Sequence, residues 1–174
     1  TEDFLLVFAG DYNKNKNQEF LIRAMEKLVK QDNSIKLLLT GEGPYKYKFE
    51  KLIKELDLYS NVFLMGFCRE MPYLIAMSDL GVSSSIREGL PLNIIESEAC
   101  GLPVVASDNR GHREIIQNGI NGFLFEIGDM NSFVDHILLL RRNKELYSKI
   151  AVKCRPSVEK FDLNINKYKK GSNE

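Results

Sequence analysis

Six short apolar segments, each followed by an amphipathic or polar stretch, constrain the fold of this 174-residue chain more than any other feature. Residues 4–9 form a continuous apolar run, which is typical of a strand buried on both faces of a sheet. Residues 19–29 follow with apolar side chains at the spacing of a helix that buries one face. This repeated alternation predicts an α/β fold, a Rossmann-like parallel sheet of about six strands with helices on both faces.

The other elements are predicted by the same two patterns. Further strands are expected at residues 35–39, 62–65, 80–82, 104–106 and 123–125. Further helices are expected at residues 47–58, 71–78, 92–100, 131–141 and 145–152, with a single helical turn at 113–116. Residues 1–155 are therefore expected to form one domain, and the polar residues 156–174 a tail, either a helix packed on something absent or a frayed end.

The composition excludes some classes of function. Lys plus Arg and Asp plus Glu both number 24, so the net charge is zero and nucleic acid is not expected as a partner. Three cysteines without metal-ligand spacing favour a reducing, cytoplasmic compartment. No apolar run approaches the ~18 residues that cross a bilayer. Because the chain opens at Thr1 and a strand follows at once, we expect an excised domain whose partner half has been removed.

Two carboxylates, Glu88 and Glu96, flank a turn that contains Gly89 and Pro91 and leads into an apolar helical segment. The start of a helix presents unpaired N–H groups and the positive end of its dipole, which suit a phosphate. Carboxylates beside that spot accept hydrogen bonds from sugar hydroxyls, so the combination favours a sugar joined to a phosphate. The plain alternative is a pair of ordinary acids near a helix start. We expect Glu96 to be buried among its apolar neighbours and therefore to need partners.

These residues carry a resemblance to a known family. Residues 87–91 with Glu96, followed by the small-residue segment 99–106, resemble the two-glutamate signature of retaining, family 4 (group 1) glycosyltransferases. The resemblance covers nearly the whole chain and implies the C-terminal, donor-binding half of the GT-B fold. Residues 1–155 would then be a nucleotide-sugar-binding domain, and the tail would pack on a missing N-terminal domain.

The resemblance also implies roles for single residues. Glu88 would contact hydroxyls of the transferred sugar, and Glu96 would bind the ribose. The diphosphate would be held by the backbone N–H groups of residues 89–92 and by Lys16. The family usually has Arg where this chain has Asp11, and a carboxylate there repels phosphate, so Lys14 or Arg87 would have to compensate.

Two further turns follow predicted strands. The turn at Gly41 and Gly43 lacks both phosphate-loop fingerprints, and it either lines the donor cleft or simply joins a strand to a helix. Relatives read the base near Gly66 and Phe67 through main-chain contacts. The candidate catalytic residues are thus Glu88 and Lys16. The candidate donor-binding residues are Gly10, Lys16, Gly41, Gly43, Gly66, Phe67, Glu88, Gly89, Leu90, Pro91, Leu92 and Glu96. His112 is expected to be an exposed loop histidine without a specific role.

The expected function is retaining transfer of a hexose from a nucleotide-diphosphate sugar to a glycan, lipid or protein acceptor held by the missing domain. No cofactor and no metal are expected, and the fragment alone should transfer nothing. The full-length protein is expected in the cytoplasm, with peripheral association at the inner face of the membrane as one option. Two alternatives stay open: a sugar-nucleotide epimerase or phosphorylase-like enzyme, and a non-catalytic module that binds nucleotide sugars.

Overall fold

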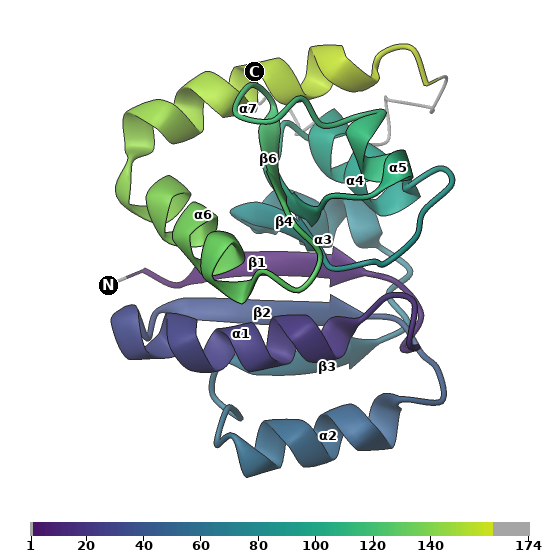
Figure 1. Cartoon of the computed structure of the whole chain (residues 1–174), viewed down its shortest axis with the longest axis vertical. Coiled ribbons are helices and arrows are strands. Elements are labelled where there is room, and N and C mark those ends of the chain that lie inside the picture. Colours follow the sequence, from purple (N-terminus) through teal and green to yellow (C-terminus); the bar gives the residue numbers. More distant parts are fainter. Residues whose placement is uncertain (1, 162–174) are drawn as a thin grey trace.

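A computed structural model describes residues 2–161 and contains one parallel sheet with strand order β3-β2-β1-β4-β5-β6 (Figure 1). The strands are β1 Phe4–Ala9, β2 Ile35–Thr40, β3 Val62–Gly66, β4 Leu80–Ser83, β5 Val104–Ser107 and β6 Gly122–Phe125. The helices are α1 Gln18–Gln31, α2 Lys46–Glu55, α3 Met71–Met77, α4 Leu92–Ala99, α5 Arg110–Arg113, α6 Met130–Arg142 and α7 Lys144–Val158. The predicted fold class is confirmed.

The strand order places a switch point between β1 and β4. From β1 the chain continues outward to β2 and β3, whereas β4 pairs with the other side of β1 and continues to β5 and β6. The loops after β1 and β4 therefore diverge at one spot on the carboxyl edge of the sheet, where doubly wound folds bind their ligands.

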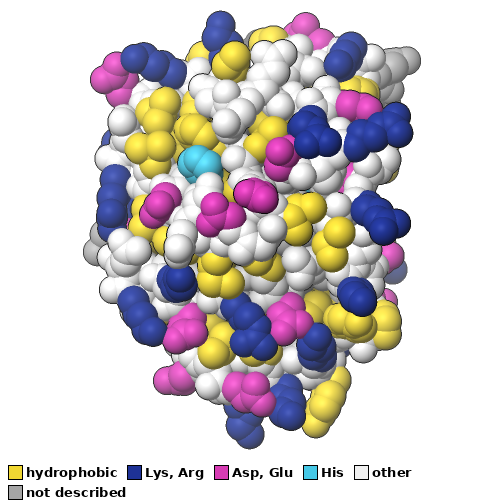
Figure 2. All heavy atoms as spheres, in the orientation of Figure 1, with side chains coloured by type: hydrophobic (Ala, Val, Ile, Leu, Met, Phe, Trp, Pro, Cys, Tyr) yellow, Lys and Arg dark blue, Asp and Glu magenta, His cyan; other side chains and the backbone are white. Residues whose placement is uncertain are grey.

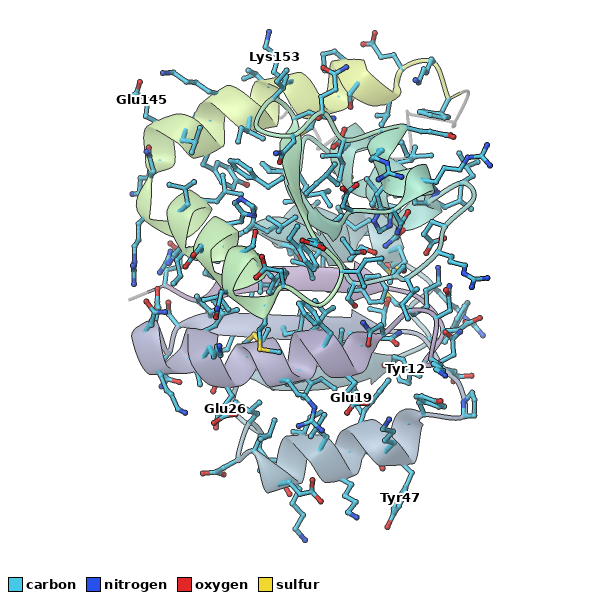
Figure 3. The ribbon with its side chains drawn as sticks, viewed as in Figure 1. Tyr12, Glu19, Glu26, Tyr47, Glu145 and Lys153 are labelled. Carbon is cyan, nitrogen blue, oxygen red and sulfur yellow. The ribbon has the colours of Figure 1, made fainter. Side chains whose placement is uncertain are left out.

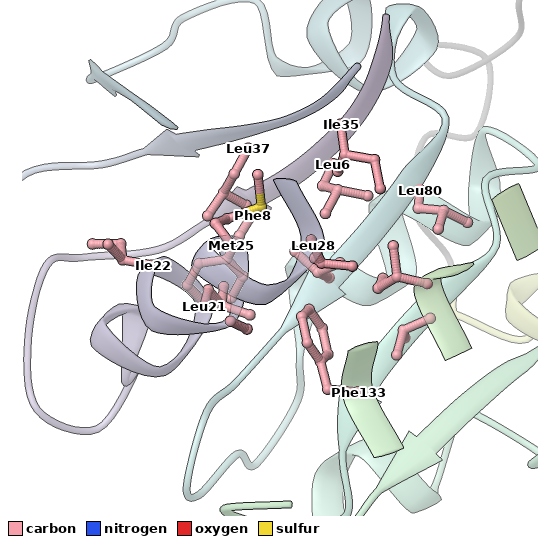
Figure 4. Packing of buried hydrophobic residues seen from close by; sticks show 14 of the residues in the cluster. Leu6, Phe8, Leu21, Ile22, Met25, Leu28, Ile35, Leu37, Leu80 and Phe133 are labelled. Carbon is pink, nitrogen blue, oxygen red and sulfur yellow. The ribbon is translucent and has the colours of Figure 1, made fainter. Parts of the chain in front are cut away.

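The larger core lies between the sheet and the helices α1 and α6, which Figure 1 shows in front of it. Strand side chains alternate between the two faces, so Leu6 and Phe8 of β1 point into this core while Val7 points to the opposite one. Leu21, Met25 and Leu28 of α1 form the helical side of the packing (Figure 4).

Two smaller clusters cover the other face of the sheet. Ile94 and Ile95 of α4 pack on Val104 of β5, and Ile75 of α3 packs on Val7. Helix α4, which begins directly after the two-glutamate turn, is therefore fixed on the sheet by its apolar side chains.

Two predicted elements differ from the structure. The helical turn expected at 113–116 forms at Arg110–Arg113, because Asn109 caps it by accepting a hydrogen bond from the His112 N–H. The last helix was predicted to end at residue 152 but runs through Pro156 to Val158, whose side chain is fully buried. The remainder of the predicted tail, residues 162–174, lies outside the described residues.

The surface of the face in Figure 2 carries side chains of both charges interspersed. Ion pairs such as Glu19 of α1 with Lys48 of α2, 2.6 Å apart, connect neighbouring helices, and Figure 3 labels Glu19 on the side of α1 toward α2. Among residues 2–161, no helix combines the length and the apolar character needed to cross a membrane.

Candidate functional site

The loop after β1 and the loop after β4 are bound to each other through Asn15. Its backbone carbonyl accepts the Ile86 N–H at 2.8 Å. Its side-chain amide donates to the Arg87 carbonyl at 3.0 Å and accepts the Arg87 N–H at 3.2 Å. Three hydrogen bonds from one residue thus hold the two loops in a fixed register at the switch point.

Ser84 adds a second connection between these loops. Its hydroxyl is buried, and its oxygen lies 2.9 Å from the carbonyl oxygens of both Lys16 and Asn17. Asn17 has left-handed backbone angles, with φ of 54°, so the chain turns sharply before α1 begins. The result is that Lys16 points toward the loop after β4 rather than into solvent.

Lys16 and Glu88 form an ion pair between Nζ and Oε1, with only 23% and 10% of their side chains exposed. Both predicted catalytic residues are therefore brought together by the fold. Partial burial strengthens their attraction relative to an exposed pair, since less water screens it. The pair places an ammonium group and a carboxylate side by side next to the start of α4.

The start of α4 offers fewer amides than the sequence suggested. Pro91 occupies the N-cap position and has no N–H, so it cannot donate to a phosphate. The Leu92 N–H donates to the Leu90 carbonyl at 3.0 Å. Within residues 2–161, no acceptor takes the N–H groups of Gly89 and Leu90, so in this segment those two remain for a ligand.

The second signature acid is less buried than predicted. Glu96 is partly exposed, and Leu92, expected in the core, is 51% exposed. The fully buried carboxyl group of α4 is that of Glu98, which accepts a hydrogen bond from the Asn121 amide and contacts the Ser157 hydroxyl. Burial raises the pKa of Glu98 to about 8. The prediction erred because α4 buries positions 94, 95 and 97–99, which leaves Glu96 partly exposed.

Close contacts with the loop after β1 account for the two glycines in the turn after β2. A Cβ on Gly41 would lie 2.2 Å from the Gly10 carbonyl oxygen, and one on Gly43 would lie 2.5 Å from that of Tyr12. Both glycines also have positive φ angles, of 134° and 153°. The turn is therefore pressed against the loop after β1, and Tyr12 and Glu42 join the two loops through an N–H···O bond of 2.8 Å.

The remaining predicted donor-binding residues lie along the same edge of the sheet. Gly10 directly follows β1 and its N–H donates to the Thr40 carbonyl, while the Gly41 N–H donates to the Gly66 carbonyl at 2.8 Å. The following Phe67 is 70% exposed. Figure 3 labels Tyr12 at this edge of the molecule. Backbone hydrogen bonds thus connect the segments at Gly66, Gly41 and Gly10 along this edge, and the last of them leads into the loop that carries Lys16.

From the sequence, two residues of this region, Asn15 and Ser84, were assigned no role, and a third, His112, was predicted with the wrong exposure. Asn15 and Ser84 are polar residues in polar segments, and no sequence pattern distinguishes them from ordinary loop residues. His112 was expected to be exposed but is fully buried, because the cap at Asn109 starts α5 early and turns the ring inward. Burial lowers the pKa of His112 below its ordinary value.

Residues 1–155 match the family described as "Glycosyl transferases group 1". EpsD of Bacillus subtilis (strain 168), which carries the name of a glycosyltransferase, is 41% identical over 160 residues, 92% of this chain and 42% of EpsD. An N-acetyl-alpha-D-glucosaminyl L-malate synthase of Bacillus anthracis is 32% identical over 88% of this chain and 40% of its own length. The chain thus spans less than half the length of these relatives.

A solved structure gives the same picture. A variant of TarM from S. aureus, in complex with fondaparinux, alpha-GlcNAc-glycerol and UDP, superposes with a TM-score of 0.88 at 32% identity. The match covers 91% of this chain and 32% of the TarM chain. The order of strands and the position of the helices are therefore shared with a much longer protein.

Proposed function

This chain belongs to the group 1 glycosyltransferases, and we propose that it forms the half of such an enzyme that binds the nucleotide-sugar donor. The complete protein would transfer the sugar to an acceptor with retention of configuration at the reacting carbon. The acceptor, a glycan, lipid or protein, would be bound by the part of the protein outside this chain. This chain spans 42% of EpsD, and the complete protein would include that further part and contact a membrane peripherally.

The observation that carries the proposal is the Lys16–Glu88 pair at the switch point, next to the N–H groups of Gly89 and Leu90, which no acceptor within residues 2–161 takes. A cation and two amides suit the diphosphate, and a carboxylate suits the sugar hydroxyls. The TarM variant was solved in complex with UDP, which agrees with a donor of this kind. Glu96, partly exposed one turn into α4, is assigned to the ribose.

These residues also suggest how the reaction is assisted. When the bond between the sugar carbon and the diphosphate oxygen breaks, negative charge develops on the diphosphate. Lys16 and the amides of Gly89 and Leu90 stabilise that charge without having to reorganise, which is the usual source of electrostatic catalysis. Glu88 would hold the sugar through its hydroxyls while the acceptor oxygen forms its bond to the same carbon and passes its proton to the leaving diphosphate oxygen. Gly10, Gly41, Gly43, Gly66, Phe67, Pro91 and Leu92 shape the edge along which the nucleotide lies.

Calorimetric titration of the chain with UDP-glucose, UDP-N-acetylglucosamine and the corresponding GDP and ADP sugars tests the proposal. We expect weak, millimolar-range binding of at least one donor, because half of the cleft is absent, and no transfer. Lys16→Met should weaken this binding about tenfold or more, while the matched exposed control Lys54→Met on α2 should leave it unchanged. Absence of heat and of chemical-shift changes with every donor at millimolar concentration would contradict the proposal.

One observation favours a second candidate, a module that binds a nucleotide sugar without transferring it. Asp11 is exposed in the loop after β1, where the family signature has Arg, so the phosphate site lacks one cation. Glu88→Gln and Glu96→Gln in the complete protein separate the two functions. If the complete wild-type protein is active and either change inactivates it, the protein is an enzyme. The product that it forms then distinguishes sugar transfer from the epimerase or phosphorylase alternative.

A further inference from the structure

Beneath the Glu88 loop lies a set of polar side chains that are all buried and come from the ends of β4 and β5 and the start of α5. This buried polar cluster consists of Ser83, Ser85, Ser107, Asn109 and His112. Buried polar groups need hydrogen-bond partners, and here the members supply them to one another. The cluster touches the loop that carries Glu88 but contains none of the residues assigned to the donor.

The cluster fixes the start of that loop at the Ser85 carbonyl. This oxygen accepts hydrogen bonds from the Ser107 hydroxyl at 2.6 Å and from the Asn109 side-chain amide at 2.9 Å. Both lone pairs of the carbonyl are thus used, three residues before Glu88. The position of Glu88 therefore depends on Ser107 and Asn109 being held in place.

His112 holds both of them. Its ring atom Nδ1 lies 2.6 Å from the Ser107 carbonyl oxygen, and its backbone N–H donates to Asn109 Oδ1 at 3.1 Å. Because a carbonyl oxygen accepts and never donates, this 2.6 Å contact assigns the hydrogen to Nδ1. The Asn109 amide nitrogen also lies 3.1 Å from Nδ1, and with that assignment it donates to the Ser85 carbonyl instead. The other ring nitrogen, Nε2, faces the Ser83 hydroxyl at 3.4 Å and acts as an acceptor in a neutral ring.

A second contact links α5 to the same loop. A Cβ on Gly111 would lie 2.5 Å from the Glu88 carbonyl oxygen and 2.8 Å from that of Gly89. The backbone of α5 therefore rests directly against the two residues that present the carboxylate and one of the available amides. Any movement of α5 would be transmitted to Glu88 and Gly89.

We propose that His112, as the neutral ring with its hydrogen on Nδ1, is the positioning residue that holds Glu88 and Gly89 in the geometry that recognises the donor sugar. The inference rests on the proposed function and deepens it. His112 does not contact the donor; it acts through Ser107, Asn109 and Gly111.

The charges around the ring add a dependence on pH. Glu88 and Lys16 act on it from the loops after β4 and β1, and Asp108 acts from the segment after β5. Burial lowers the pKa of His112 below its ordinary value and so favours the neutral ring. Protonation would put a hydrogen on Nε2, opposite the Ser83 hydroxyl, and a second cation beside the Lys16–Glu88 pair. We therefore expect sugar recognition to weaken as the pH falls below the pKa of His112.

The test compares His112→Asn with His112→Leu in the full chain. The Asn side chain places an N–H near the position of Nδ1 and cannot become charged, whereas Leu fills the space without a donor. At pH 7.5 we expect UDP-glucose affinity within about threefold of wild type for the Asn variant and at least about tenfold weaker for the Leu variant. His136→Asn is the matched control, because His136 is the other histidine of the chain and packs on Phe123 of β6.

Two readouts separate positioning from a purely structural role. The ring ¹⁵N shifts should report hydrogen on Nδ1 of His112, and the acid-side loss of UDP-glucose affinity should be present in wild type and absent in the Asn variant. UDP-glucose suits this experiment because its charge does not change over that pH range. Amide exchange at Glu88 and Gly89 should accelerate in the Leu variant.

Hydrogen on Nε2, or a Leu variant with unchanged exchange and affinity, would overturn the inference. A wild type that binds no nucleotide sugar would instead refute the proposed function. In that case the ring shifts and the amide exchange still decide whether His112 positions the loop.

Discussion

Lys16 and Glu88 lie 72 positions apart in the chain, and their side chains form an ion pair at the switch point of the sheet. Hydrogen bonds of Asn15 and Ser84 hold the two loops together, and this brings Lys16 and Glu88 into contact. Its two members have different proposed ligands, the diphosphate for Lys16 and the sugar for Glu88. This difference can be measured.

Glu88→Gln should weaken UDP-glucose binding but not UDP binding. Without the carboxylate, Lys16 loses its competing partner, so its charge is more available to phosphate and UDP should bind about as well as or better than to wild type. Lys16→Met should weaken both ligands about tenfold or more. Calorimetry with UDP and UDP-glucose on the two variants gives the comparison, and Glu126→Gln, an exposed acid before α6, is the control. Equal losses of UDP and UDP-glucose in the Glu88 variant would refute its assignment to the sugar.

Gly111→Ala should destabilise the protein and loosen the Glu88 loop. The added Cβ would meet two backbone carbonyl oxygens at 2.5 and 2.8 Å, and backbone cannot move aside as a flexible side chain can. We expect a loss of about 1–3 kcal/mol in the free energy of unfolding, measured by urea denaturation. Gly89→Ala is the matched control, because a Cβ there would meet nothing within 4 Å. Equal stability of both variants would show that α5 does not press on the loop.

The sheet could be predicted from the sequence because each strand is a short apolar run that ends at a turn. Residues 4–9 and 104–106 illustrate this, since burial on both faces leaves little choice of structure. The helical turn near residue 113 was misplaced because a single cap, Asn109, decides where so short a helix begins. The last helix was predicted to end at residue 152 because the sequence beyond it is polar, but burial of Val158 holds the helix to that residue.

The charged residues of the site could be predicted from the sequence, but the residues that hold them in place could not. Glu88 and Lys16 stand in recognisable patterns, whereas the hydrogen bonds of Asn15 and Ser84 depend on which loops the strand order brings together. The burial of His112 depends on three separate segments meeting, which no local pattern encodes. Glu98 lies on the same helical face as Ile94 and Ile95, so helical phase alone would have predicted it as the buried acid.

Asp11→Asn should strengthen donor binding, and Asp11→Arg should strengthen it more. Asp11 is exposed in the loop that carries Lys16, and its negative charge repels a diphosphate. We expect a gain of about twofold to threefold for Asn and more for Arg, largest at low salt because exposed charges are screened. Titrations with UDP-glucose at two salt concentrations measure it, with Asp135→Asn on α6 as the control. An affinity that is unchanged at low salt would mean that Asp11 points away from the donor.

Glu98 should make the protein less stable at alkaline pH. The Ser157 oxygen contacts both Glu98 Oε2 and the Cys154 carbonyl oxygen, and one hydroxyl hydrogen cannot satisfy two acceptors. A protonated Glu98 supplies the missing hydrogen, in agreement with burial that raises its pKa to about 8. The folded state therefore keeps a proton that the unfolded chain releases from about pH 4.5 upward.

The direction in which stability changes with pH follows from that difference in bound protons. The stabilisation by Glu98 is complete below about pH 4.5 and is lost as the pH rises to about 8, after which it no longer changes. Glu98→Gln keeps a donor for Ser157 and an acceptor for Asn121 but cannot ionise. Its free energy of unfolding relative to wild type should therefore increase between pH 5 and 8, by on the order of 3 kcal/mol. Denaturation curves across this range measure the increase, and Glu126→Gln should show none. A constant difference between the Gln variant and wild type would mean that Glu98 is ionised in the folded protein.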